Sequence, residues 1–282
     1  MAVDDPGTAS PVRDLFLVLL LAAVVFVPFS WSRELNDPDE GRFGSIGKTM
    51  YTTGDWVTPR INDMAFLDKP PLVYWIEAAS MHALGPVEFA ARTPNLLSGL
   101  LWVLFVFLFA RDWRGDGRSA FFAAAVAATA VAGISGSRFG PHLDMPLAAC
   151  TTGALYAAWR GLRRPSLAAH AGLGLALGLG LLAKGPVAGA VVVAVAIGWA
   201  VAGVSLRRIL GLALSPVAWI VALAVAAPWY LLVERAHPGT FAHFVGHEHV
   251  SRFAQGDYRQ FHPFWYFVPV VVLYLVPWTP VA

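Results

Sequence analysis

Five short segments hold most of the side chains in this chain that could do chemistry. Some carry carboxylates, which can act as a base or hold a metal ion, and others carry cations or histidines. The segments and their leading residues are 37–43 with Asp39 and Glu40, 66–75 with Lys69, 137–146 with Asp144, 182–186 with Lys184, and 241–253 with Arg252. Such a set indicates a site that joins acids to cations.

The adjacent carboxylates Asp39 and Glu40 follow the first apolar run of the chain. A carboxylate near a membrane surface can take a proton from a hydroxyl. Two of them could also bind a divalent cation, although nothing in the sequence requires a cofactor. The alternative is a solvated turn in which Asp39 caps a helix that begins near Glu40.

Lys69 directly precedes two prolines. A residue before proline is held extended, and proline is favourable at a helix start because its missing N–H had no partner there. The start of that helix would add partial positive charge beside the lysine. The segment therefore predicts an anion site at membrane height, with a lysine that merely snorkels to the interface as the alternative.

Asp144 and Lys184 each stand at the end of an apolar run. An acid at the mouth of two spans is usually functional or paired with a cation, and Arg138 is its nearest neighbour of opposite charge in the sequence. Lys184 stands at the tip of a tight helical hairpin. It could bind an anionic headgroup or act as a plain interface anchor.

The fifth segment contains His243, His247 and His249, a spacing that invites a zinc interpretation. Its order is His-Glu-His rather than His-Glu-x-x-His, and on a helix Glu248 and His249 would not share a face. We therefore predict no metal site. Arg252 fits better as a phosphate ligand, because a guanidinium matches two phosphate oxygens.

Taken together, Lys69, Lys184 and Arg252 supply cations that suit a lipid-linked phosphate. The carboxylates beside them suit removal of a proton from an acceptor hydroxyl. This combination predicts glycosyl transfer from a polyprenyl phosphate.

The composition indicates that such a site belongs to a membrane protein. Hydrophobic residues make up 57% of the chain and charged residues 13%, where roughly 25% charged residues is usual in soluble domains. So few charges could not cover a soluble surface, and we predict an all-α integral membrane protein. A net charge of +2 and the lack of a basic cluster interleaved with aromatics argue against nucleic acid. The single cysteine, Cys150, is interpreted as a packing residue.

Eight apolar runs are predicted as membrane spans, since about 20 residues are needed to cross a bilayer. They are 15–31, 87–110, 119–135, 145–159, 167–183, 187–204, 209–233 and 264–281. The run 70–84 is shorter and contains Glu77 and His82. We predict that it lies at the membrane interface, with Tyr74 and Trp75 at headgroup level.

The basic residues predict the orientation. Short loops at 111–118, 160–164 and 205–208 carry eight arginines, and short basic loops stay in the cytoplasm. Eight alternating spans place all three loops inside and the segments 32–69, 137–144, 184–186 and 234–263 outside. The chemistry is therefore predicted on the periplasmic or extracellular side of the cell membrane.

The order and spacing of several short motifs resemble the ArnT-like and protein O-mannosyltransferase-like glycosyltransferases of the GT-C class. The likeness covers nearly all of the chain. Its motifs include Asp39-Glu40-x-Arg42-Phe43, Lys69-Pro70-Pro71-Leu72-x-Tyr74-Trp75, Arg92-x-Pro94-Asn95, Leu143-Asp144, Leu182-Ala183-Lys184-Gly185-Pro186 and Glu248-His249-x-x-Arg252-Phe253.

The resemblance implies one membrane domain over 1–282, in which residues 32–86 form a catalytic outer loop with juxtamembrane helices. It implies a polyprenyl-phosphate-linked sugar as donor and inversion at the anomeric carbon. Asp39 or Glu40 would be the base, and Asp144 would help to arrange the acceptor or the base. Lys69 and Arg252 would contact the donor phosphate. Supporting roles would fall to other residues of the matched motifs, namely Arg42, Tyr74, Arg92, Glu248 and His249.

Members of that family usually continue for several more spans and often a soluble domain, so we expect this chain to lack those parts. The sugar stays open, and the acceptor could be a lipid A-like glycolipid, another cell-envelope glycan or a protein. A transporter or flippase for a lipid-linked or anionic substrate is one rival function, and a non-catalytic membrane subunit is another. The sequence shows no clear internal repeat, which disfavours the transporter.

Overall fold

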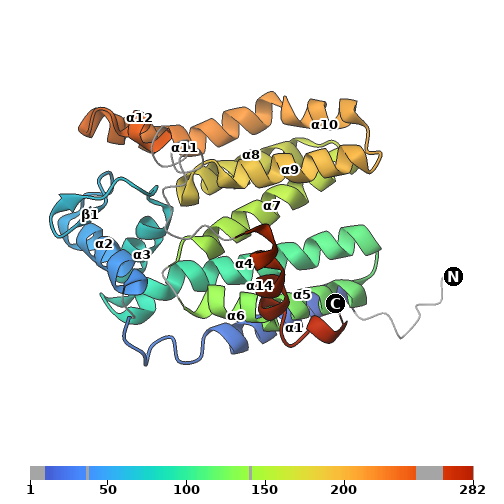
Figure 1. Ribbon diagram of the computed structural model, residues 1–282, viewed down its shortest axis with the longest axis horizontal. Coiled ribbons are helices and arrows are strands. Elements are labelled where there is room, and N and C mark those ends of the chain that lie inside the picture. Colours follow the sequence, from blue (N-terminus) through green and yellow to red (C-terminus); the bar gives the residue numbers. More distant parts are fainter. Residues whose placement is uncertain (1–9, 36–37, 140–141, 246–262, 282) are drawn as a thin grey trace.

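The computed structural model describes residues 10–35, 38–139, 142–245 and 263–281, which are mostly helical (Figure 1). The first part contains α1 (Pro11–Phe26), α2 (Asp39–Thr53), the strands β1 (Arg60–Ile61) and β2 (Met64–Ala65), α3 (Leu72–Leu84) and α4 (Glu88–Arg114). The middle contains α5 (Gly117–Thr129), α6 (Val131–Arg138), α7 (Asp144–Arg163), α8 (Leu167–Lys184) and α9 (Val187–Val201). The last part contains α10 (Leu206–Ala213), α11 (Pro216–Ala236), α12 (Thr240–Val245), η2 (Phe264–Tyr266), α14 (Phe267–Tyr274) and η3 (Thr279–Val281).

Three helical segments of the described chain are long and apolar enough to cross a bilayer. They are α4, α8 and the combined stretch Leu206–Ala236, and α5 with α6 would make a fourth if this pair, bent by 59°, were one span. The predicted count of eight spans is therefore not confirmed. Several predicted runs yield helices shorter than the span length, such as α9 with 15 residues and α14 with 8.

Prolines and extended residues explain where predicted spans are cut. The run 15–31 was expected to be helical throughout, but α1 ends at Phe26, two residues before Pro28. Proline has no N–H to continue the backbone ladder. The run 119–135 is interrupted at Ala130, whose ψ of 151° is extended. The chain therefore bends between α5 and α6.

Side-chain caps begin three of the long helices. Asp116 accepts from the backbone N–H of Ser119 at the start of α5, at 2.6 Å between nitrogen and oxygen. Ser166 and Ser215 act likewise at α8 and α11. Each such cap satisfies a backbone N–H that the helix leaves unpaired, and contributes about 1 kcal/mol.

Small residues allow the long helices to pack closely. A Cβ atom at Gly174 of α8 would lie only 2.2 Å from the carbonyl oxygen of Ala218 in α11. One at Gly178 would lie 2.9 Å from the carbonyl oxygen of Ala222. Glycine is thus required where these backbones approach, as in other membrane helix pairs. A second core joins Val18 of α1 to apolar residues of α4 and α5.

The segment between α1 and α4 forms a compact unit at one end of the long helices. Figure 1 shows α2, α3 and β1 together on the left. The strands pair antiparallel, with Arg60 opposite Ala65. With 13 residues, α3 is too short to cross a bilayer, as predicted for an interfacial helix.

Candidate active site

Arg92 is fully buried and is the centre of a polar network that connects α4 with the start of α2. Its guanidinium donates to the carbonyl oxygens of Ser30 and Arg33, both at 2.7 Å, and to that of Glu34 at 2.9 Å. It also donates to the Glu40 carboxylate at 3.3 Å. A buried charge needs such partners to offset its lost hydration. Arg92 therefore holds the chain between α1 and α2 against α4.

The two candidate carboxylates of the first segment stand in different surroundings. Glu40 is 3% exposed and pairs with Arg33 at 2.7 Å as well as with Arg92. The side chain of Asp39 is 48% exposed and pairs with Arg42 on the next turn of α2. The residue at the N-cap position of α2 is Pro38, and Asp39 is already the first residue of the helix, so the capping alternative is not confirmed. Asp39 is the carboxylate that an external molecule can reach.

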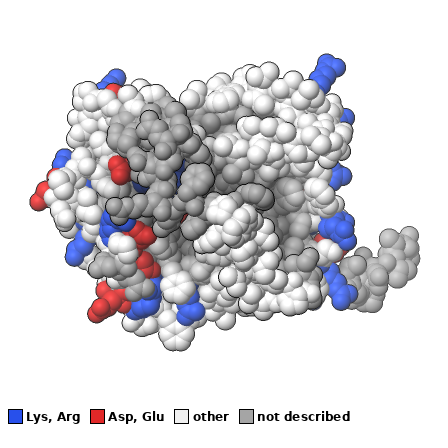
Figure 2. Space-filling view, viewed as in Figure 1, with Lys and Arg blue, Asp and Glu red and all other residues white. Residues whose placement is uncertain are grey.

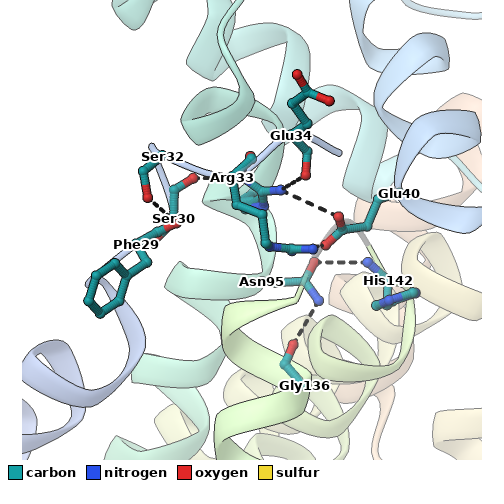
Figure 3. A network of polar contacts seen from close by, with 10 residues as sticks. Phe29, Ser30, Ser32, Arg33, Glu34, Glu40, Asn95, Gly136 and His142 are labelled. Atoms are coloured by element: carbon teal, nitrogen blue, oxygen red, sulfur yellow. Dashed lines mark hydrogen bonds and ion pairs between the residues drawn. The ribbon is translucent and has the colours of Figure 1, made fainter. Parts of the chain in front are cut away.

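Asn95, one turn after Arg92 on α4, holds the connection between α6 and α7. Its side-chain nitrogen donates to the carbonyl oxygen of Gly136 at 2.9 Å, and its side-chain oxygen accepts from the backbone N–H of His142 at 3.2 Å (Figure 3). Asn95 is fully buried. Asp144 follows two residues after His142, so Asn95 fixes the segment that carries this acid. Sequence reasoning quoted Asn95 within a motif but assigned it no role.

Asp144 forms an ion pair with Lys184, which corrects the expectation that Arg138 would be its partner. Asp144 is the first residue of α7 and Lys184 the last of α8. These helices run antiparallel through a short connection, so the start of one lies beside the end of the other. Both charges also suit the helix dipoles at these ends. The Arg138 guanidinium instead lies 5.2 Å from the centre of the Phe29 ring.

Lys69 is half-buried directly before α3. Its ammonium donates to the carbonyl oxygen of Asp68 at 3.2 Å, and α3 begins right after Pro71, as the double proline predicted. Leu67 and Leu72, on either side of Lys69, pack against a cluster that contains Leu182. The Lys69 segment therefore lies against the end of α8 that carries Lys184.

The loop after α2 is folded and held by hydrogen bonds. The carboxylate of Asp55 accepts from the backbone N–H groups of Val57 and Thr58, both at 3.0 Å. Partial burial alone would raise the pKa of Asp55, but these hydrogen bonds and Arg60 outweigh it and the pKa is lowered. The indole of Trp229 in α11 donates to the carbonyl oxygen of Val57 at 2.9 Å. The outer loop is thereby attached to α11.

Tyr74 does not face the molecular surface, where an interfacial anchor would contact lipid headgroups. It is fully buried between α2 and α3, with its ring centre 6.2 Å from that of Phe43. Glu77, one turn later on α3, is also fully buried, and neither of its oxygens has a hydrogen-bond partner within the described residues. Burial raises the pKa of Glu77 well above its ordinary value, because the charged carboxylate would lose its hydration there. A Cβ atom at Gly47 would collide with it, at 2.1 Å from the Oε2 atom.

Three predicted site residues, Glu248, His249 and Arg252, lie outside the described residues, as do His247 and Asp37. Among the residues that the structure describes, no group of three or more histidine, cysteine, aspartate or glutamate side chains could hold a metal ion. The prediction that no cofactor is required stays a prediction. The described part of the site thus offers an accessible acid, Asp39, a cation, Lys69, and the ion pair of Asp144 with Lys184.

A helical fold with apolar spans and a cluster of acids and cations at one end defines a multi-pass membrane protein with a polar site at the helix ends. Residues 68–231 match the family described as dolichyl-phosphate-mannose-protein mannosyltransferase. The chain belongs to this family, which confirms the resemblance seen in its motifs.

One relative is the undecaprenyl phosphate-alpha-4-amino-4-deoxy-L-arabinose arabinosyl transferase of Pectobacterium atrosepticum. It is 31% identical over 270 residues, which cover 94% of this chain and 48% of the relative. The crystal structure of ArnT from Cupriavidus metallidurans in the apo state superposes with a TM-score of 0.81 at 29% identity, covering 96% of this chain and 49% of that one. The same protein bound to undecaprenyl phosphate gives a TM-score of 0.73 at 28% identity, with the same coverage of 96% and 49%. The chain thus spans about half the length of the curated relatives it matches.

Proposed function

We propose that this protein is a glycosyltransferase that moves a sugar from a polyprenyl-phosphate donor to an acceptor hydroxyl or phosphate. The observation that carries the proposal is that two side chains of α4 each hold a segment next to a candidate acid. Arg92 holds Glu40, the neighbour of Asp39, while Asn95 holds the segment before Asp144. One turn of one helix thereby positions two acids whose residues are far apart in the chain. The relatives support the donor, since one is named for an undecaprenyl-phosphate-linked sugar and another binds undecaprenyl phosphate.

The proposed reaction is a single displacement with inversion. Asp39 takes the proton from the acceptor hydroxyl as its oxygen attacks the anomeric carbon. The bond between that carbon and the phosphate oxygen breaks, and the polyprenyl phosphate leaves with the electron pair. The leaving group is already an anion, so cationic stabilisation by Lys69 and Arg252 is the main electrostatic requirement. No covalent sugar–enzyme step is needed, unlike in retaining enzymes.

The remaining residues have positioning roles in this proposal. Glu40 is buried in ion pairs with Arg33 and Arg92, which suits a residue that fixes the start of α2 rather than a base. Lys184 would hold Asp144 beside the acceptor and add a cation near the phosphate. Arg42 would orient Asp39, with which it pairs. The acceptor itself would be a lipid A-like glycolipid, another cell-envelope glycan or a protein.

We further propose eight spans, with the site on the non-cytoplasmic face of the cell membrane. The arginine-rich loops follow α4, α7 and α9, while Asp144 and Lys184 stand at the opposite ends of α7 and α8. Figure 2 shows acids mainly on the left and a right-hand edge that is mostly basic. Since short basic loops stay in the cytoplasm, this asymmetry supports an outward-facing site.

The test compares two substitutions in the same outer loop. Asp39→Asn removes the proposed base with little change in size, whereas Asp63→Asn neutralises an exposed acid in the turn between β1 and β2. Transfer of labelled sugar from a panel of polyprenyl-phosphate donors is measured in membranes. We expect Asp39→Asn to lower transfer by about 10²- to 10⁴-fold and Asp63→Asn to leave it unchanged. Full transfer by the Asp39→Asn protein would refute the assignment.

A further inference from the structure

A cavity of about 350 Å³ lies at the opposite end of α7 from Asp144. It is formed where the end of α7, the start of α8 and α10 meet, and Arg163, His170 and Arg208 line it. The helix α7 has 20 residues and so is about 30 Å long, which separates Arg163 from Asp144 by roughly the thickness of a bilayer. The cavity is therefore distinct from the proposed active site.

The walls of this basic pocket are held by close packing and a hydrogen bond. Gly161 and Leu212 meet so closely that a Cβ atom at Gly161 would lie 2.8 Å from the Leu212 side chain. The imidazole Nδ1 of His170 lies 2.6 Å from the hydroxyl oxygen of Ser215, a buried residue that caps α11. This contact leaves Nε2 of His170 for another partner. The positions of the pocket residues are thus set by α7, α8 and α11 together.

The charge of the pocket is positive and uncompensated by its own lining, which contains no acid. The Arg163 guanidinium donates to the backbone carbonyl of Asp112 at 2.9 Å and lies 5.4 Å from the centre of the Trp159 ring. Among the described residues it pairs with no carboxylate. The carboxylate of Asp112 pairs with Arg160 at 3.5 Å. Within the described residues, Arg208 makes no ion pair.

We propose that this basic pocket binds a phosphate group, with Arg163 and Arg208 as guanidinium ligands and His170 as a hydrogen-bond partner. The lining of this one cavity includes two arginines, and guanidinium groups match the oxygens of a phosphate monoester or diester. On α10, the exposed Leu206 and Leu210 share one face of the helix while Arg208 lies on another. Such an amphipathic helix suits a lipid surface, which favours the headgroup of an anionic phospholipid as the source. A soluble phosphate compound is the other source of the same chemistry.

The test uses the whole chain in nanodiscs and a matched pair of double variants. Arg163→Gln with Arg208→Gln removes the proposed ligands, and Arg164→Gln with Arg207→Gln removes the same charge from neighbouring exposed arginines outside the pocket. Retained phosphatidylglycerol is counted by native mass spectrometry after reconstitution in phosphatidylcholine that contains a minor fraction of this lipid. In a second arm, glycerol phosphate is titrated into nanodiscs of phosphatidylcholine alone, and thermal stabilisation is followed.

We expect the pocket variant to lose binding at least about tenfold in one of the two arms, while the neighbouring variant keeps it. Loss of phosphatidylglycerol identifies a lipid headgroup, and loss of the response to glycerol phosphate identifies a soluble ligand. Equal losses in both double variants would show that diffuse positive charge attracts the anion, and the pocket proposal would fall. It would also fall if the wild type bound neither probe.

Discussion

Lys184 and Asp144 join the last residue of α8 to the first residue of α7 in an ion pair across the helical hairpin. Both side chains keep solvent contact, with 32% and 76% of their surface exposed. Exposed pairs stabilise a fold by only about 0–1 kcal/mol, so this one matters less for folding than for where it holds its charges. It places a carboxylate and an ammonium together at the end of the bundle that also receives Lys69.

The first prediction concerns this pair. We expect Lys184→Ala and Asp144→Ala each to lower sugar transfer, and the double variant to lose less than the product of the two effects, since each partner acts through the other. Thermal midpoints should change little. The cycle is measured from initial transfer rates, with Arg138→Ala as the control, because Arg138 was the partner expected from the sequence. Losses that multiply independently would show that the two residues are not coupled.

The second prediction concerns Arg92. Replacing Arg92 with Ala would leave the buried Glu40 carboxylate with one fewer cation and three carbonyl groups without their donor. We expect a loss of about 3–5 kcal/mol in the free energy of unfolding. Arg92→Lys should recover only part of it, because an ammonium lacks the planar fork. Denaturant unfolding in detergent measures both, and an exposed arginine at the other end, Arg164, serves as the control. Wild-type stability of Arg92→Ala would contradict this account of the network.

The third prediction concerns Asn95. Asn95→Ala removes the hydrogen bonds to Gly136 and His142 and should cost about 1–3 kcal/mol, because buried backbone groups lose their partners. Transfer should fall further than the folded fraction does, since Asp144 follows this segment. Asn95→Asp keeps the acceptor for the His142 N–H and should recover part of the activity. Thr93→Ala is the control, since the hydroxyl of Thr93 bonds within its own helix, to Phe89. Equal activity per folded molecule in wild type and Asn95→Ala would remove the positioning role.

The fourth prediction is a pH dependence from Glu77. Burial raises the pKa of Glu77, so the folded state keeps a proton that the unfolded state releases above its ordinary pKa of about 4.3. Above that pKa the folded state therefore binds more protons than the unfolded state, and the free energy of unfolding falls as the pH rises. Glu77→Gln is neutral at every pH and should flatten the dependence of stability on pH. Its free energy of unfolding, relative to that of the wild type, should therefore be higher at pH 8 than at pH 5.

Thermal midpoints measured from pH 5 to pH 8 test the Glu77 prediction. The exposed Glu88, changed to Gln in the same way, is the matched control. If Glu77→Gln gave the same change of thermal midpoint with pH as the wild type, the protonation of Glu77 would not differ between the folded and unfolded states from pH 5 to pH 8.

Several features could be predicted from single residues and their neighbours. The double proline after Lys69 predicts the start of α3, because proline is favourable there and restricts the residue before it. The glycines of α8 predict close packing, which Gly174 makes against α11. The span count was less predictable. Whether an apolar run forms one straight helix depends on local breaks such as Ala130, which the hydropathy of the run does not reveal.

The order of residues along the chain is enough to identify a helical membrane protein of the mannosyltransferase family. Composition and short motifs suffice for that, because a bilayer leaves few ways to satisfy backbone groups and the motifs are local. The packing of the helices was needed to show that Glu40 is buried while Asp39 is accessible, and that Asp144 pairs with Lys184 rather than Arg138. Arg92 lies 52 residues from Glu40 and Lys184 lies 40 residues from Asp144, so which of these charges meet depends on which helix ends the folded chain brings together.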